Sequence, residues 1–308
     1  RGLPEATIRD FWRRTYRPAN TVIAVAGDLP HKEALDLAAT AFGTGNGVVP
    51  GFAPAPALPA GERVLVGKRQ SSQAQLVVGL PALHRDHPDA WALALLNAVL
   101  GDGMSSRLFL SVREELGIAY DISSGLVDYA GALEISAGVD PASLKPALQA
   151  ILVELARLRD EPIPAVELEK AKRYLSGGLE LRMDETRHVA SWIGGQEALH
   201  DRVLTVDQAL ERIAAVTATD VQRVAGDLMR DEGLRLTARA LERDDDDARY
   251  HGRIRVAAGG GSGTTSKGTP GTTGAAPAKA ATASTTSAAP AQIAPRSRRN
   301  PARCISAA

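Results

Sequence analysis

A helix, a turn and a strand follow one another in the same order at two places far apart in the chain. The hydrophobic spacing predicts this unit from Ala6 and again, with nearly the same length, from Ala218. Coincidence would explain the match, since helix, turn and strand often succeed one another. A duplicated domain would explain it too, and then residues 1–42 are the end of a first copy and residues 62–240 a complete second copy.

The first residues agree with a duplication. Arg1 to Glu5 read as a loop that leads straight into a helix, with no initiator methionine and no signal peptide. This beginning predicts that the chain starts inside a longer protein; a processed mature N-terminus is the alternative.

The region between the two units predicts strands first and then many helices. Beyond the first unit, which includes a helix over 31–42, the predicted strands are 63–66, 75–79, a pair within 118–139 that turns near Ala130-Gly131, and 234–240. The predicted helices are 91–100, 107–116, a stripe over 148–158 whose first turn Pro146 places in doubt, a long one over 165–200, 206–215 and 219–229. Gly177-Gly178 and Gly194-Gly195 are candidate bends in the long helix. The order predicts an α+β fold, a mixed or antiparallel sheet with helices packed on it.

Two segments lack the spacing of packed elements. Residues 43–61 are rich in Gly, Pro and Ala and are predicted to be a linker. Residues 241–308 begin with an acidic run and continue almost entirely in Ala, Gly, Ser, Thr, Pro and Lys. Such a composition cannot bury enough apolar surface to offset the entropy of ordering, so this tail is predicted to be disordered.

Charge and cysteine content exclude several classes of protein. Lysine and arginine number 36, as do aspartate and glutamate, which argues against a nucleic-acid binder. No run approaches the roughly 18 apolar residues of a membrane span. The only cysteine, Cys304, excludes an intrachain disulfide and a cysteine-based zinc site. The compartment is not fixed by these features, and a bacterial protein of this kind fits the cytoplasm or the periplasm.

The histidines do not form a recognisable metal motif. Neither H-E-x-x-H nor H-x-x-E-H occurs. His84 and His87 stand three apart before a helix, with no glutamate between them, and are interpreted as surface residues that flank a helix cap. G-x-S-x-G and P-loop sequences are also absent, so the sequence holds no complete metal, nucleophile or phosphate site.

Residues 101–120 are the most informative segment. Gly101 and Gly103 give a flexible turn between two helices, and Ser105 or Ser106 can cap the second helix. Gly117 then ends that helix.

Arg113 and Tyr120 lie on either side of the Gly117 stop, where a guanidinium and a phenol can converge on a peptide carbonyl. Spacing alone favours a plainer interpretation, in which Arg113 pairs with a carboxylate and Tyr120 is half-buried.

The same segment resembles the second half of the insulinase/pitrilysin-type zinc peptidases, including their processing-peptidase branch. A Gly-rich turn precedes Ser106-Arg107-Leu108-Phe109, and Arg113-Glu114-Glu115-Leu116-Gly117-Ile118-Ala119-Tyr120 follows. Tyr16 to Asn20, with the strand after it, resembles the end of the family's first domain. Leu168 to Leu175, with Lys170, Lys172 and Tyr174, resembles a helix of its second domain. The resemblance spans about residues 1–240.

The resemblance implies a division of labour between two halves. The family's first half holds zinc with H-x-x-E-H and a further glutamate, and its motif glutamate activates water. The second half closes over it, and its arginine and tyrosine contact the peptide substrate. Carried over, these are Arg113 for substrate binding and Tyr120 for substrate binding and catalysis. The chain itself would bind no metal and would be inactive alone, and it would need the missing half or a catalytic subunit, within one chain or in a homo- or heterodimer.

A second function stays open at this point. Some relatives of processing peptidases are scaffold subunits, as in respiratory complexes, which act by protein–protein contact. The short turn at Gly101–Gly103 lacks the extended glycine loop of non-catalytic processing subunits and resembles the single-chain bacterial type. An H-x-x-E-H sequence upstream of Arg1 would indicate the enzyme, and its absence the partner.

Overall fold

The computed structural model describes residues 2–43, 64–68, 72–127, 131–200, 203–230, 234–240 and 305–307. Nearly all of the predicted linker and most of the predicted disordered tail lie outside these residues. Within the tail, Ile305–Ala307 form a short strand.

Eight α-helices occur in the described part. They are α1 (Glu5–Thr15), α2 (His31–Phe42), α3 (Ala90–Leu100), α4 (Leu144–Asp160), α5 (Ala165–Met183), α6 (Thr186–Leu199), α7 (Val206–Ala215) and α8 (Ala218–Leu228). Shorter or irregular turns are η1 (Pro18–Asn20), η2 (Phe109–Glu115) and η3 (Pro141–Ser143). The strands are β1 (Ala24–Ala26), β2 (Val64–Lys68), β3 (Ala74–Pro81), β4 (Ala119–Val127), β5 (Ala132–Val139), β6 (Arg235–Ala240) and β7 (Ile305–Ala307).

Five of these strands form one mixed sheet in the order β2-β6-β3-β5-β4. β2 and β6 are parallel, whereas β3 pairs antiparallel with β5 and β6, and β5 pairs antiparallel with β4. Alternate residues of β3 are buried, so the strand turns Leu76 and Val78 to one face and Gln75 to the other. The predicted α+β fold is confirmed.

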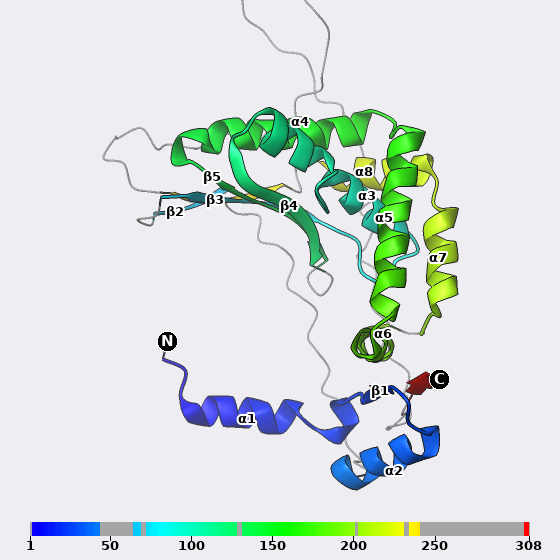
Figure 1. Ribbon diagram of the computed structural model, residues 1–308. Coiled ribbons are helices and arrows are strands. Elements are labelled where there is room, and N and C mark those ends of the chain that lie inside the picture. The colour runs from blue at the N-terminus through cyan, green and yellow to red at the C-terminus, as the bar shows by residue number, and fades with distance from the viewer. Residues whose placement is uncertain are drawn as a thin grey trace, which may run out of the picture.

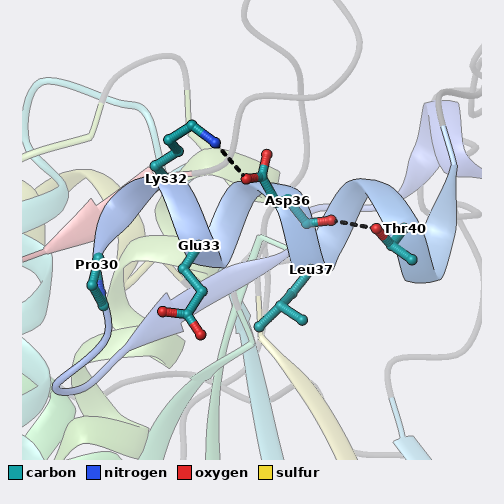
Figure 2. Close-up of a pocket in the computed structure, with 6 residues that line it drawn as sticks. All are labelled: Pro30, Lys32, Glu33, Asp36, Leu37 and Thr40. Atoms are coloured by element: carbon teal, nitrogen blue, oxygen red, sulfur yellow. Dashed lines mark hydrogen bonds and ion pairs between the residues drawn. The ribbon is translucent and has the colours of Figure 1, made fainter.

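The apolar face of the sheet packs against helices. Figure 1 shows α3, α4 and α8 on the same side of the sheet, and their buried side chains join those of β3 and β5 in a single core. α3 contributes most, because eight of its eleven residues are buried, among them Leu95, Leu96 and Leu100. A helix that is apolar on nearly every side belongs in the interior of such a layer.

The N-terminal residues form a separate small unit, drawn in blue in Figure 1. β1 pairs in parallel with β7 and lies against α6. Gly194 of α6 makes this approach feasible, since a Cβ there would stand 2.9 Å from the Cβ of Ala24. No residue of α1 is buried.

The long helix predicted over 165–200 is divided, and the predicted bends are wrong. The chain breaks between Met183 and Thr186, not at either glycine pair. Asp184 and Glu185 occupy the junction, and Asp is a weak helix former that favours helix ends. Glycine is tolerated inside a helix when tertiary packing holds it, and Gly194 serves a close contact instead of a bend.

Pro146 does not disturb the helix in which it lies. α4 begins at Leu144, so the proline is its third residue. The first turn of a helix has no partner for its backbone N–H groups, and a proline there loses no hydrogen bond. Pro146 therefore leaves the first turn of α4 intact.

Candidate functional site

The glycine turn after α3 is held tightly from the side of β4. Gly101 ends α3, and its carbonyl accepts a hydrogen bond of 3.0 Å from the backbone N–H of Ser124. The Ser124 hydroxyl donates to the Asn97 side-chain oxygen at 2.7 Å, and both side chains are buried. A Cβ on Gly101 would stand 2.6 Å from the Ser124 nitrogen, so only glycine fits here.

The predicted serine cap of the next helix is not present. The Ser106 hydroxyl donates to the Gly103 carbonyl at 2.7 Å, within the turn, instead of accepting from a helix N–H. Gly103 has φ of 110°, which favours glycine. Ser106 therefore closes the turn, and it is buried.

The helix predicted over 107–116 is a π-helix for most of its length, from Phe109 to Glu115. Its wider turn is visible in the hydrogen bond of 3.1 Å from the Leu116 N–H to the Ser111 carbonyl, five residues back. Such turns are rare and often occur at functional sites. Gly117, at φ of 62°, ends it as predicted.

Arg113 stands on this π-helix and is exposed. Its guanidinium carbon lies 4.9 Å from the centroid of the Phe109 ring, a cation–π contact. No carboxylate within the described residues forms an ion pair with it. The plainer interpretation, an Arg113–carboxylate pair, is therefore wrong for this part of the chain.

Tyr120 lies at an irregularity of β4. Ala119 pairs with Val139 and Asp121 with Gly138, so Tyr120 is an extra residue without a partner on β5. Tyr120 and Asp121 are consequently both exposed, where a regular strand would expose only one of them. Bulges of this kind re-aim side chains beside active sites. The Tyr120 side chain is 55% exposed, and its hydroxyl has no hydrogen-bond partner among the described residues.

Sequence reasoning found both residues but missed the two backbone irregularities that carry them. The π-helix and the bulge lie side by side, because η2 packs against β4. Neither leaves a clear sign in the hydrophobic spacing, which is compatible with a regular helix and a regular strand. An exposed guanidinium and an exposed phenol thus flank Gly117, and both are available to a ligand.

α5 contacts the other side of the glycine turn. The Arg107 guanidinium donates two hydrogen bonds, of 2.8 and 2.7 Å, to the Glu167 carboxylate. The Tyr174 hydroxyl donates to Asp102 at 3.1 Å. Glu167 is the main cause of a raised pKa of Arg107, which therefore stays charged. Burial, and then the Asp102 carboxylate, raise the pKa of Tyr174.

A buried acidic residue stands near this ion pair. Glu154 of α4 is 4% exposed, and one of its oxygens accepts from Arg157 at 3.1 Å. Its other oxygen has no partner, nor does one terminal nitrogen of Arg107. The Glu154 charge adds to the raised pKa of Arg107, so α4 and α5 both present carboxylates to this guanidinium.

The described residues do not fit a zinc ion. No three His, Cys, Asp or Glu side chains among them gather in a way that would hold a metal. His84 and His87 are exposed, and each Nδ1 accepts a backbone N–H two residues on, of Asp86 and Asp89 respectively. They are local caps of the loop before α3, as interpreted from the sequence.

Within the described part of the chain, no helix is both long enough and apolar enough to cross a membrane.

Comparison with known proteins assigns the chain to a family. The family described as "Peptidase M16 inactive domain" matches residues 3–175, more than half of the chain. The chain therefore belongs to the M16 peptidases, through their inactive domain. The resemblance predicted from residues 101–120 is confirmed at this level.

Bacterial zinc proteases are similar to this chain over most of the region that contains its predicted helices and strands. An uncharacterized zinc protease of Streptomyces coelicolor is 34% identical over 72% of this chain and 50% of its own length. One of Mycobacterium leprae is 31% identical over 74% of this chain and 52% of its own length. The chain thus spans about half the length of these relatives.

Solved structures share the fold. The peptidase M16 inactive domain protein of Pseudomonas fluorescens aligns with a TM-score of 0.70 at 22% identity, over 78% of this chain and 58% of that one. A protease of Helicobacter pylori aligns with a TM-score of 0.67 at 20% identity, over 77% of this chain and 59% of that one. At such low identity the likeness speaks for the fold alone.

Proposed function

We propose that this chain is the substrate-binding half of a zinc metalloendopeptidase that cleaves peptides or small unfolded proteins. Zinc and the water-activating glutamate belong to a separate H-x-x-E-H half, and the chain is inactive without it. Support comes from the inactive-domain family and from zinc proteases about twice as long as the matched region. The described residues contribute no zinc ligands of their own, so no step through the metal is assigned to them.

One observation carries the assignment of the site. Arg113 and Tyr120 are exposed on a π-helix and a β-bulge that pack together, and neither polar group has a hydrogen-bond or ion-pair partner in the described structure. Arg107, six positions before Arg113, is instead paired with Glu167. Two free polar groups on irregular backbone are what a ligand site requires.

Their chemistry suits a peptide substrate. A guanidinium offers several donors and holds a peptide carbonyl before reaction. A phenol donates one hydrogen bond, which strengthens as negative charge develops on the carbonyl oxygen in the transition state. Arg113 therefore serves binding throughout, and Tyr120 serves mainly the transition state.

Kinetics of the assembled enzyme test this division. With the H-x-x-E-H half supplied, Tyr120→Phe should lower kcat on the order of 10²-fold with KM little changed, the usual loss for one oxyanion donor. Arg113→Ala should also raise KM. Thr219→Val is the control, because Thr219 is an exposed hydroxyl residue on α8, within the domain that carries the site. Full activity of Tyr120→Phe, or unfolding by either site substitution, would refute the assignment for that residue.

The isolated chain offers a separate test. Residues 1–308 should bind no stoichiometric zinc and hydrolyse no peptide. One tightly held zinc per chain with chelator-sensitive peptidase activity would contradict the proposal. A scaffold subunit would give the same negative result alone, but would stay inactive with its partner half present and would be preceded by no H-x-x-E-H sequence.

A further inference from the structure

The turn that contains Gly101 and Gly103 is held by β4 on one side and by α5 on the other, and the two sets of contacts differ in burial. On the β4 side, the contacts to Asn97 and Ser124 are buried and leave no room for a Cβ on Gly101. On the α5 side, the contacts are polar and partly open to solvent, since Tyr174 is 47% exposed and the Glu167 side chain 28%. The first side is part of the core, and the second is not.

The α5 contacts come from one face of that helix. Glu167 and Tyr174 are seven residues apart, two helical turns, and so point the same way. They reach Arg107 and Asp102, at the two ends of the turn. The Tyr174 ring also lies against the turn, because a Cβ on Gly103 would stand 3.3 Å from it.

The turn connects the two halves of the proposed site. η2, which carries Arg113, begins two residues after Arg107. β4, which carries Tyr120, is fixed to the turn by Ser124. If the part of the turn after Gly101 moved away from α5, the start of η2 would move with it while Gly101 and β4 stayed in the core. The spacing between the guanidinium and the phenol would then change.

We propose that Tyr174 and Glu167 are positioning residues, which hold the glycine turn from α5 and so set where Arg113 stands relative to Tyr120. This inference rests on the proposed function of those two residues. Neither positioning residue touches the substrate. Their effect is geometric, and small displacements at a reacting centre cost large factors in rate, up to roughly 10²-fold for 1 Å.

Tyr174→Phe separates positioning from folding. The variant keeps the ring against Gly103 and removes only the hydroxyl that donates to Asp102. That hydrogen bond is solvent-exposed, so Tm should change by less than about 2 °C. With the H-x-x-E-H half supplied, kcat/KM should fall about fivefold, a loss expected of a slightly misplaced site. Thr219→Val, the loss of an exposed hydroxyl on α8, should retain parental kcat/KM.

Double substitutions make the test specific. Asp102→Ala should lower kcat/KM as much as Tyr174→Phe, and combining the two substitutions should lower it no further. Asp102→Asn keeps the acceptor oxygen and should therefore retain most of the parental kcat/KM.

In an Arg113→Ala background, Tyr174→Phe should have no effect, because the group that it positions is gone. Glu167→Gln should follow the same rule.

The outcomes distinguish the two levels of the proposal. If Tyr120→Phe and Arg113→Ala lower activity while Tyr174→Phe does not, the positioning role is overturned and the proposed function stands. Equal losses from Tyr174→Phe with and without Arg113 also overturn it, as does a loss matched by Thr219→Val. If Tyr120→Phe and Arg113→Ala themselves are fully active, the proposed function fails first.

Discussion

The two helix–turn–strand units have the same local sequence pattern but differ in how they pack. α8 buries Val221, Val224 and Ala225, and the strand that follows it, β6, pairs on both sides within the five-stranded sheet. α1 buries none of its residues, and the strand after it, β1, pairs only with β7 among the described residues. In Figure 1, α8 lies within the packed domain whereas α1 extends away from it.

The difference shows that an amphipathic helix becomes part of a core only where its sheet is present. The apolar stripe of α1 includes Ile8, Phe11 and Trp12, each more than half exposed, and Trp12 stacks on Tyr16 at the end of the same helix. Most helical stability comes from tertiary packing of such a face. We propose that residues 1–42 complete a first copy of the domain, and that the sheet of that copy covers α1.

Placing a charge on the apolar face of each helix gives the largest expected contrast. Val221 is fully buried, so Val221→Asp should lower the free energy of unfolding by about 4 kcal/mol or more, through an unpaired buried charge. Phe11→Asp should change it by less than about 0.5 kcal/mol in the isolated chain. Urea unfolding of both variants measures this.

A milder substitution at Val221 keeps the comparison measurable if Val221→Asp does not fold. Val221→Ala should cost about 2 kcal/mol from lost burial and the cavity left behind. Equal losses at Val221 and Phe11 would mean that α1 packs as firmly as α8, and the comparison would fail.

Supplying the upstream half should make the two units alike. Once a sheet covers α1, its backbone amides should exchange hydrogen more slowly, roughly thirtyfold, which corresponds to about 2 kcal/mol of added protection. The amides of α8 serve as the internal control and should be unchanged. Unaltered exchange in α1 would reject the proposal that residues 1–42 belong to a first copy.

Deleting the last five residues tests the pairing of β1 with β7. In the described part, β7 is the only strand that pairs with β1. Deletion of 304–308 takes away β7 and should speed exchange at Ala24–Ala26 by about tenfold. The Tm of the domain should stay within about 1 °C, because β7 lies outside the five-stranded sheet. A drop of several degrees would show that the C-terminal residues stabilise the whole domain.

An ion pair gives α8 an anchor that α1 lacks, and its effect should be the smallest. Arg223 donates two hydrogen bonds to Asp89, at the start of α3, whereas α1 forms its ion pairs within itself, as between Arg9 and Glu5. Hydrogen bonding to Arg223 lowers the pKa of Asp89. The stabilisation is therefore full above the ordinary aspartate pKa, about 3.9, and is lost as pH falls through the lower folded value.

Asp89→Asn tests this anchor. It should reduce Tm slightly at pH 7, and the difference from the parent should shrink as pH falls below about 4. Asp227→Asn is the matched control, because Asp227, near the end of α8, pairs with Arg230 just beyond the helix and not with another helix. A difference between parent and Asp89→Asn that persists at acid pH would assign the effect to something other than the carboxylate charge.

Much of the fold follows from local patterns in the sequence. β-branched and apolar runs gave strands, and stripes at helical spacing gave helices such as α2, whose bounds agree with the prediction. The division of the long helix was missed because two glycine pairs are the stronger local signal, while the break at Asp184 depends on how α5 and α6 pack.

Local patterns in the sequence likewise predicted the residues of the candidate site, but not their geometry. The type and order of Arg113 and Tyr120 are written in the chain, and so is the Gly117 stop between them. The bulge at Tyr120 is not, since it arises from the register between β4 and β5, which are held by contacts along their whole length. The π-turn at Arg113 likewise depends on the packing of η2 against β4.

The sequence by itself therefore determined most of the elements, their order, the family and the identity of the candidate residues. The tertiary structure alone decided which polar groups are free and which are paired. Arg107 and Arg113 are six positions apart and chemically identical, yet one is bound by Glu167 and the other is open. The physical reason is that pairing depends on a residue sixty positions away, brought near only by folding, whereas hydrophobic spacing is a property of neighbours.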